Sequence, residues 1–413
     1  MKRISFTLLP LLLVVIVLFG FYSNGSALQE TVAQQATTGL PGARPTIDAA
    51  KYPSIQAALD ALPEEGGLVQ LPAGTFEITE PLVLRAGDTC LLGAGTATHI
   101  KNMNTEGKPA LIIDHPHGPS DRRKNRLWRI RLANFRITGN PQSGHGIEAL
   151  WINEMFIDGV TVSYHGKDGI RLDHCYEDPR VCDSLITYNK GTGLNLIGCH
   201  DIIVSANQFE ENQDALHCTD GFNLCMTGNN LDDHLGHGVV IENTYGSVVS
   251  GNMIEECAGT AIILDRDCYG ITLSANVIAH NGAGIDLRDA HGCAVSANTF
   301  TLMKKNALRI ATGSGRIAVT GNSFCNSYIG EGKVRRRVDD LEAGGLVLEG
   351  ASDITISGNQ FSSVRPKAFA LLGQQNRRVL FANNLLTDVL SDHEKLQQSL
   401  VTDNLTDEPA VKK

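Results

Sequence analysis

Side chains capable of acid–base chemistry recur at near-constant spacing through the middle of the chain. His217, Glu242, Asp265 and Arg288 follow one another at intervals of 23 to 25 residues. A histidine and a carboxylate held together can move a proton, and a guanidinium can neutralise an anionic group beside them. The regular interval indicates that a repeating structural unit positions these groups.

An asparagine closes each copy of a repeat in the same region. The repeated positions are Asn207, Asn229, Asn252, Asn276, Asn298, Asn322, Asn359 and Asn383. Their spacing is 22 to 24 residues except for one interval of 37, and such a period is typical of a solenoid. Apolar residues alternate inside each copy, as in residues 238–242, which is strand spacing rather than helix spacing. We therefore expect stacked coils of short parallel strands, with the asparagines in a structural column of turns and stacked amides.

These repeats resemble the right-handed parallel β-helix proteins of the pectin-lyase-like superfamily. Residues 54–60, followed by the segment 63–76 with its Gly66-Gly67 pair, are similar to the capping helix and first coil of that group. The resemblance covers roughly residues 46–385. It implies an all-β solenoid, a single-stranded right-handed parallel β-helix with an N-terminal capping helix. It leaves the function open, because one fold carries many chemistries.

The two ends of the chain differ from the repeats. Residues 1–27 have Lys2 and Arg3 before an apolar run and a small-residue stretch, which predicts a secretory signal peptide or, alternatively, an uncleaved N-terminal anchor. Residues 28–45 are expected to be a linker, and residues 386–413 a polar C-terminal tail with a helical turn. The predicted location is secreted, periplasmic or on the cell surface, with membrane contact only through an uncleaved N-terminal segment.

The long interval contains an expected insertion at residues 325–343. It carries Arg335, Arg336 and Arg337, which form either a solvated loop or a clamp over an anionic polymer. The net charge of −10 argues against nucleic acid as a partner but does not exclude an acidic polysaccharide in a local groove.

The chain has 10 cysteines. Export favours disulfides, and Cys175 with Cys182 is the expected local bridge. Cys218 is expected to point inward, and the remaining cysteines fill the coil interior equally well as small apolar side chains. The sequence has no Cys-x-x-Cys pair, so a zinc site is not expected.

Strand alternation predicts two outward columns of side chains on one sheet. The first column is Glu148, Arg171, Asn195, His217, Val240, Ile263, Asp286, Arg309, Val347 and Ala370. The second column is Leu150, Asp173, Ile197, Thr219, Glu242, Asp265, Arg288, Ala311, Glu349 and Leu372. In this arrangement Glu242 and Asp265 would lie on adjacent coils, about 5 Å apart. Charges gather between Glu148 and Arg309, either as a functional groove or as ion pairs that keep the surface soluble.

Three functions are compatible with such a face. The first is a lyase or epimerase for a uronate-containing polysaccharide, with His217 as the base and Arg171 or Arg288 neutralising the substrate carboxylate. The second is a polygalacturonase-like hydrolase using two of Asp214, Glu242 and Asp265, because Asp214 and then Gly236-His237-Gly238 follow the order of that family. The third is a non-catalytic carbohydrate-binding or surface solenoid.

The candidate residues follow from these alternatives. The expected catalytic residues are His217, Asp214, Glu242 and Asp265. The expected substrate-binding residues are Arg171, Asp173, Asp286, Arg288 and Arg309. If their oxygen atoms converge, Glu242, Asp265 and Asp286 would form a Ca2+ site, although no cofactor is certain. The low aromatic content, with 2 Trp and 8 Tyr, slightly favours an enzyme or a plain scaffold over a sugar-binding protein.

Overall fold

The computed structural model describes residues 40–325, 344–373 and 375–407. Residues 44–413 form one compact unit, which is described here by itself. The predicted signal peptide or anchor (1–27), most of the linker, and residues 326–343 of the expected insertion, including Arg335 to Arg337, lie outside the described residues. In the described part of the chain, no helix has the length and apolarity to cross a membrane.

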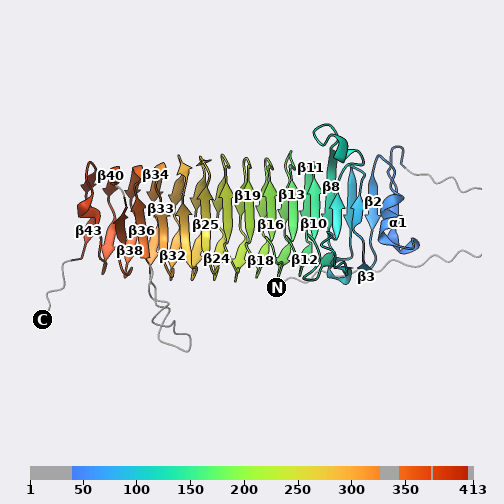
Figure 1. Ribbon diagram of the computed structural model, residues 1–413, viewed down its shortest axis with the longest axis horizontal. Coiled ribbons are helices and arrows are strands. Elements are labelled where there is room, and N and C mark those ends of the chain that lie inside the picture. Colours follow the sequence, from blue (N-terminus) through green and yellow to red (C-terminus); the bar gives the residue numbers. More distant parts are fainter. Residues whose placement is uncertain (1–39, 326–343, 374, 408–413) are drawn as a thin grey trace, which may run out of the picture. The chain divides into compact units, whose positions relative to one another are not determined.

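The unit is a right-handed solenoid of about 14 turns, in which successive coils add strands to three parallel sheets. The strands lie side by side along the long axis, from α1 at one end to β43 at the other (Figure 1). The expected all-β parallel β-helix is therefore confirmed.

Sheet 1 has 12 strands and carries the expected functional face. Its strands are β4 (Leu82–Leu84), β7 (Leu111–Ile113), β10 (Ile147–Leu150), β13 (Ile170–Asp173), β16 (Leu194–Ile197), β19 (Leu216–Thr219), β22 (Val239–Glu242), β25 (Thr260–Asp265), β29 (Ala283–Leu287), β33 (Asn306–Ile310), β36 (Gly344–Glu349) and β39 (Phe369–Leu372).

Sheet 2 has 17 strands and follows sheet 1 in each coil. Its strands are β1 (Thr46–Asp48), β2 (Gly67–Gln70), β5 (Thr89–Leu92), β8 (Leu127–Ala133), β11 (Ile152–Asp158), β14 (Arg180–Cys182), β17 (Ile203–Ser205), β20 (Cys225–Thr227), β23 (Val248–Ser250), β26 (Cys268–Tyr269), β27 (Thr272–Ser274), β30 (Ala290–His291), β31 (Ala294–Ser296), β34 (Gly315–Thr320), β37 (Ser352–Ser357), β40 (Arg377–Ala382) and β42 (Leu400–Thr402).

Sheet 3 has 14 strands and completes each coil. Its strands are β3 (Gly74–Ile78), β6 (Thr98–Asn102), β9 (Arg136–Thr138), β12 (Thr161–Ser163), β15 (Leu185–Thr187), β18 (Gln208–Glu210), β21 (Asn230–Asp232), β24 (Met253–Glu255), β28 (Val277–Ala279), β32 (Thr299–Thr301), β35 (Ser323–Cys325), β38 (Gln360–Ser362), β41 (Leu385–Thr387) and β43 (Leu405–Thr406).

In the part of the chain that the structure describes, helix is confined to short segments. They are α1 (Ile55–Asp60), η1 (Ala49–Lys51), η2 (Gly95–Ala97), η3 (Gly118–Ser120) and η5 (His393–Lys395). Helix α1 lies within the segment 54–60 that resembles a capping helix, and the Oγ of Ser54 caps it by accepting from the backbone N of Ala57 at 3.1 Å. The Gln56 side chain bonds to both backbone groups of Val83 in β4, the edge strand of sheet 1. A role for α1 as the cap of the solenoid stays a prediction.

The coils continue beyond the expected boundary at residue 385. Strand β40 pairs with β42, and β41 pairs with β43, so a further coil stands where a polar tail was expected. Side chains such as those of Leu400 and Leu405 are exposed. The segment therefore lacks the alternation of buried and exposed residues by which a strand is predicted from sequence. Backbone pairing builds it, and pairing does not depend on an apolar side-chain pattern.

Six of the ten cysteines are buried in the interior, and none forms a disulfide. Cys175, Cys199 and Cys218 are fully buried, as expected for Cys218, and all ten cysteines are free. The expected Cys175–Cys182 bridge is wrong because the two side chains lie on opposite sides of the coil wall. Cys175 is buried, whereas Cys182 flanks an inward Val181 in β14 and contacts the Oγ of Ser205 at 3.3 Å.

Buried asparagines form the predicted structural column. In each step, the amide oxygen accepts from the backbone N and the Nδ2 of the preceding asparagine; for Asn252 accepting from Asn229, these distances are 3.0 and 2.9 Å. The Nδ2 of Asn252 then donates to the Oδ1 of Asn276 at 3.0 Å. The column runs on through Asn384 and not Asn383, because Asn383 is an exposed turn residue with φ of 56°.

A second column of buried polar residues was not foreseen. His165, Asn189, Asn212 and His234 occupy successive coils, and the backbone N of Asn212 donates to the Nδ1 of His234 at 3.2 Å. Burial lowers the pKa of His165 and of His234 to about 4. Both histidines are thus neutral in the folded protein near pH 7.

Replacing Asn252 by Ala is expected to destabilise the solenoid. The change leaves the buried backbone N–H of Asn229 without its acceptor, at a cost of about 1–3 kcal/mol. Urea unfolding followed by circular dichroism measures the effect. Replacement of the exposed Lys190 by Ala is the control, with an expected change below about 0.5 kcal/mol. Equal midpoints for the two variants would contradict a stabilising role for the column.

Replacing His165 by Asn is expected to weaken the acid sensitivity of the fold. The unfolded histidine binds a proton near pH 6.5, but the folded one does so only near pH 4. The contribution of the neutral, buried histidine to the free energy of unfolding is therefore complete above pH 6.5. It is lost as the pH falls towards 4, by up to about 3 kcal/mol per histidine. Unfolding free energies at several pH values measure the slope. The exposed His117→Asn variant should keep the wild-type slope, and an unchanged slope in His165→Asn would refute the prediction.

Candidate functional site

The register of sheet 1 places the two expected columns where alternation predicted them. Arg171 pairs with Asn195, Asn195 with His217, and Thr219 with Glu242 in adjacent strands. Glu242 is likewise paired with Asp265. The polar face is nevertheless interrupted, because Val240 and Ile263 in the first column are 9% and 1% exposed. The charged residues therefore form separate groups along the axis.

The central group joins three residues from successive coils. The Nε2 of His217 lies 3.1 Å from the Oε2 of Glu242. The same oxygen accepts from Nη1 of Arg266 at 3.0 Å. Arg266 was missed by sequence analysis because it follows β25 in a turn with φ of 58°, outside the alternating columns. Its position directly after Asp265 was the available signal.

Carboxylate contact determines which nitrogen of His217 can accept a proton. If Nε2 carries the proton and donates to the ionised Glu242, Nδ1 is left with the free lone pair. The side chain of His217 is 31% exposed and that of Arg266 is 63% exposed, so a ligand can reach both. The group thus combines an oriented base with an accessible cation.

The second group lies on the following coils and is a chain of ion pairs. Asp286 accepts from Nε of Arg288 at 2.9 Å and from Nη1 of Arg309 at 3.0 Å. Arg288 also reaches Asp265 at 3.4 Å, and Arg309 donates to Glu349 through Nη2 at 2.5 Å. The structure therefore brings together four of the expected residues, Asp265, Asp286, Arg288 and Arg309.

A hollow of about 330 Å³ opens beside this second group. Its charged and titratable lining residues are His237, Asp286, Arg288, Lys305 and Arg309. Three cationic side chains thus face it with one carboxylate. The hollow suits an anionic group such as a sugar carboxylate.

Glycine makes room for the histidine in the hollow wall. A Cβ on Gly259 would lie 2.5 Å from the Nδ1 of His237. That Nδ1 accepts from the backbone N of Thr260 at 2.9 Å, so a neutral His237 carries its proton on Nε2 and acts as a donor. Sequence analysis noted His237 only in a Gly-His-Gly motif and did not select Lys305.

Asp214 is part of the backbone scaffold. Its Oδ1 accepts from the backbone N of His237 in the next coil at 2.5 Å. Asp168 does the same for the backbone N of Thr192 at 2.9 Å. The repeated contact gives Asp214 a structural role like that of Asp168, and the structure does not join it to the Glu242 or Asp265 groups.

The expected binding residues Arg171 and Asp173 form a third group near the N-terminal end of the face. Nη2 of Arg171 donates to Asp173 at 2.8 Å, and Nε of Arg171 lies 3.7 Å from Glu148. Arg171 lies two coils from His217, or about 10 Å along the axis. Arg171 and His217 therefore belong to separate groups on the face.

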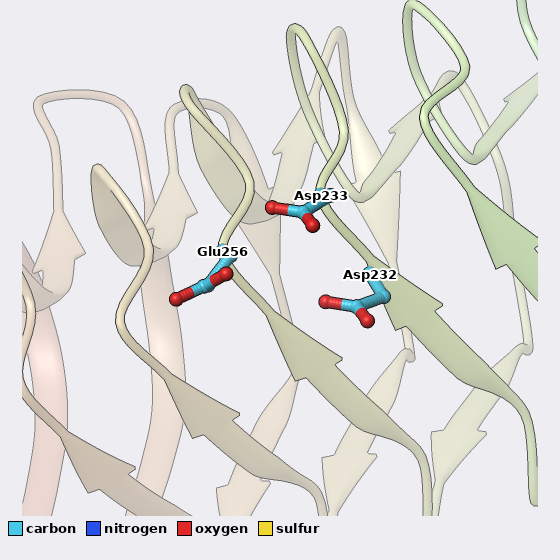
Figure 2. A group of neighbouring side chains, drawn as sticks. All are labelled: Asp232, Asp233 and Glu256. Carbon is cyan, nitrogen blue, oxygen red and sulfur yellow. The ribbon is translucent and has the colours of Figure 1, made fainter. Parts of the chain in front are cut away.

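The proposed Ca2+ ligands do not fit a calcium ion. Guanidinium groups already engage Glu242, Asp265 and Asp286, and a divalent cation among them would be repelled. The carboxylates that do converge are Asp232, Asp233 and Glu256 at the ends of β21 and β24 in sheet 3, with oxygen atoms within 4.8 Å of one another (Figure 2). Burial and the neighbouring carboxylates raise the pKa of Asp232 and Asp233.

Comparison with known proteins supports the same fold. The family model described as "Right handed beta helix region" matches residues 121–223 and 181–324. No curated protein sequence is significantly similar.

Several solved structures are similar in fold. ORF18 of Geobacillus virus E2 has a TM-score of 0.56 and 16% identity, with 70% of this chain and 63% of that chain covered. The A-module of mannuronan C-5 epimerase AlgE6 from Azotobacter vinelandii has a TM-score of 0.55 and 17% identity, with 86% and 94% covered. A mutant tailspike protein of E. coli bacteriophage HK620, solved with a pentasaccharide, has a TM-score of 0.53 and 13% identity, with 81% and 64% covered. The chain thus spans less than two thirds of the ORF18 and tailspike chains, and these identities show likeness of fold alone.

Proposed function

We propose, on the premise that this chain is a right-handed parallel β-helix repeat protein of the pectin-lyase-like superfamily, that it acts on a uronate-containing polysaccharide laid along sheet 1. Polysaccharide as the class of partner is supported by the names of two fold neighbours, a mannuronan epimerase and a tailspike solved with a pentasaccharide. The anionic character of the polymer is supported by the side chains of this chain.

The cationic hollow carries the proposal. Arg288, Lys305 and Arg309 line it, and Lys305 has no carboxylate partner among the described residues. Arg288 and Arg309 already contact Asp265, Asp286 and Glu349, so Lys305 is the charge that an entering anion would compensate. A uronate carboxylate is the anion that a sugar polymer supplies. Neutral polysaccharides would leave Lys305 uncompensated in the bound state.

The central group supplies the chemistry. His217 takes the proton from the carbon beside the uronate carboxylate, through Nδ1, while Glu242 orients the ring through Nε2. The electron pair of the broken C–H bond moves into the carboxylate, where Arg266 compensates the developing negative charge. Successive uronates of the same chain extend over the next coils, where Arg288, Lys305 and Arg309 hold their carboxylates.

Lyase and epimerase activities share this first step. In the lyase, the electron pair then expels the glycosidic oxygen on the neighbouring carbon and leaves an unsaturated sugar. In the epimerase, a water molecule on the opposite face gives a proton to the carbon, and His217 releases the abstracted proton to solvent. The positions of His217, Glu242 and Arg266 support both outcomes equally.

Hydrolysis receives less support from the geometry. An inverting or retaining glycosidase needs a carboxylic acid and a carboxylate flanking the scissile bond. Here Asp214 is engaged by a backbone N–H, and Glu242 and Asp265 by guanidinium groups. We further propose export from the cytoplasm, for which the support is the charge and apolar pattern of residues 1–27.

Replacing His217 by Asn is expected to lower kcat by about 10²- to 10⁴-fold with little change in KM. Replacing Lys305 by Ala is expected mainly to raise KM, because it removes a binding charge away from the reacting carbon. Polymannuronate, polygalacturonate and a neutral glucan serve as substrates. New ultraviolet absorbance, new reducing ends and solvent deuterium uptake are followed together.

The outcomes separate the alternatives. Absorbance with new ends indicates a lyase, deuterium uptake alone indicates an epimerase, and new ends alone would replace the proposal by hydrolysis. Lys190→Ala is the control and should keep wild-type rates. Full activity of His217→Asn would reject His217 as the base. If folded wild-type protein gives no absorbance, no reducing ends and no deuterium uptake with both uronate polymers, the proposed function is rejected.

A further inference from the structure

Aromatic rings form a continuous row along the edge where sheet 1 turns into sheet 2. One ring comes from each successive coil, three residues or so after the sheet 1 strand ends. The members of this aromatic row are Tyr176, His200, Phe222, Tyr245 and Tyr269. Trp151 and His174 extend it at the N-terminal end. One of the 2 Trp and three of the 8 Tyr are thus concentrated on one edge.

The rings contact one another from coil to coil. Ring centroids of Tyr176 and His200 lie 4.7 Å apart, as do those of His200 and Phe222, in edge-to-face arrangements. Phe222 and Tyr245 are stacked at 5.5 Å. Backbone bridges join His200 to Phe222, Phe222 to Tyr245 and Tyr245 to Tyr269, so the row follows the solenoid axis.

Two members of the row are strongly exposed. Phe222 is 42% and Tyr269 is 48% exposed. Solvent exposure of large rings in a continuous row is unfavourable and marks a binding surface more often than scattered exposed residues do. Stacking against a second flat, partly apolar partner removes that exposure.

Polar side chains border the row on both sides. On the sheet 1 side, the Nδ2 of Asn243 donates to Asp220 at 2.7 Å, and the hydroxyl of Tyr245 donates to Asp267 at 3.2 Å. On the sheet 2 side, the Nδ2 of Asn223 donates to Asp201 at 2.8 Å. The remaining carboxylate oxygens on these exposed aspartates are acceptors for hydroxyl groups.

We propose that the aromatic row and its aspartate and asparagine borders bind an extended chain of neutral sugars. The apolar C–H face of a pyranose ring stacks on an aromatic ring, while its equatorial hydroxyls reach the polar borders. The coil spacing of about 4.8 Å places one ring at each step, comparable with the advance of an extended pyranose chain.

Charge selects a neutral chain over an anionic one. Asp201, Asp220 and Asp267 border the middle of the row, where an anionic polymer would be repelled, while Arg126 and Arg316 lie over rings at its two ends. The hollow beside Arg288 and Arg309 has the opposite charge balance and lies at the other ends of the sheet 1 strands. This surface therefore goes beyond the uronate site and does not depend on it.

Isothermal titration calorimetry of the full chain with cellohexaose, β-1,4-mannohexaose and chitohexaose tests the inference. At least one of these neutral hexasaccharides is expected to bind, and saturation-transfer NMR is expected to show the axial C–H protons in contact. Phe222→Leu keeps an apolar side chain but removes the ring, and affinity is expected to fall about fivefold. Tyr269→Ala is expected to have a similar effect.

Matched variants distinguish this surface from the rest of the protein. Tyr164→Ala removes an exposed ring of a stacked pair at the end of sheet 3, and should leave binding unchanged. Lys305→Ala should also leave neutral-sugar binding unchanged, whereas Phe222→Leu should leave hexamannuronate binding unchanged. Circular dichroism melting confirms that each variant is folded.

Three results would overturn the inference. The first is the absence of heat and of saturation transfer with all three neutral hexasaccharides. The second is an equal loss of affinity in Tyr164→Ala and Phe222→Leu. The third is a loss of hexamannuronate binding in Phe222→Leu, which would assign the row to an anionic chain. None of these results bears on the catalytic assignment of His217.

Discussion

The structure depends on buried amide groups that hydrogen-bond from one coil to the next. A turn buried between coils has backbone N–H and C=O groups that water cannot reach. Each such group left without a hydrogen bond would lower the free energy of unfolding. Asparagine solves this locally, because its amide accepts from the coil before and donates to the coil after. In the second column, the side chains of Asn189, Asn212 and His234 each accept from the backbone N of the preceding member, at another turn of the coil. Register is therefore maintained from coil to coil, and parallel pairing follows.

Because the strand register is fixed, the spacing of residues in the sequence determines where their side chains lie on the solenoid. Residues that recur at the coil interval are placed in columns at the strand spacing. Charges on sheet 1 therefore meet partners from adjacent coils as well as partners two residues away in the same coil, as Arg288 does with Asp265 and Asp286. The resulting pairs are partly exposed, and each contributes little to stability by itself. Their main effect is to orient side chains. Glu242 orients His217, and Asp286 holds two guanidinium groups at the mouth of the hollow.

The two edges of sheet 1 have different surface chemistry. At the N-terminal ends of the strands, small residues such as Gly259 and Gly282 leave a hollow with excess positive charge. At the C-terminal ends, aromatic rings lie between aspartates and asparagines. A single parallel sheet thus presents a cationic edge and an aromatic, acidic edge, because each turn column is occupied by one kind of side chain over several coils. A heteropolysaccharide, or two different glycans, would match this division.

The sequence by itself determined the solenoid, its strand register and the asparagine column as far as Asn359, because a period of two along a strand and a fixed coil interval are local properties. It therefore placed His217, Glu242, Asp265 and Arg309 on one outward face, as the strand pairing confirms. Only the tertiary structure decided which of these groups meet. Arg266 lies in a turn with a left-handed backbone, so its reach to Glu242 follows from turn geometry and not from alternation. The hollow, the aromatic row and the last coil also depend on how turns of different length superpose in three dimensions. Packing between coils determines that superposition, and it cannot be predicted from the spacing of residues within one coil.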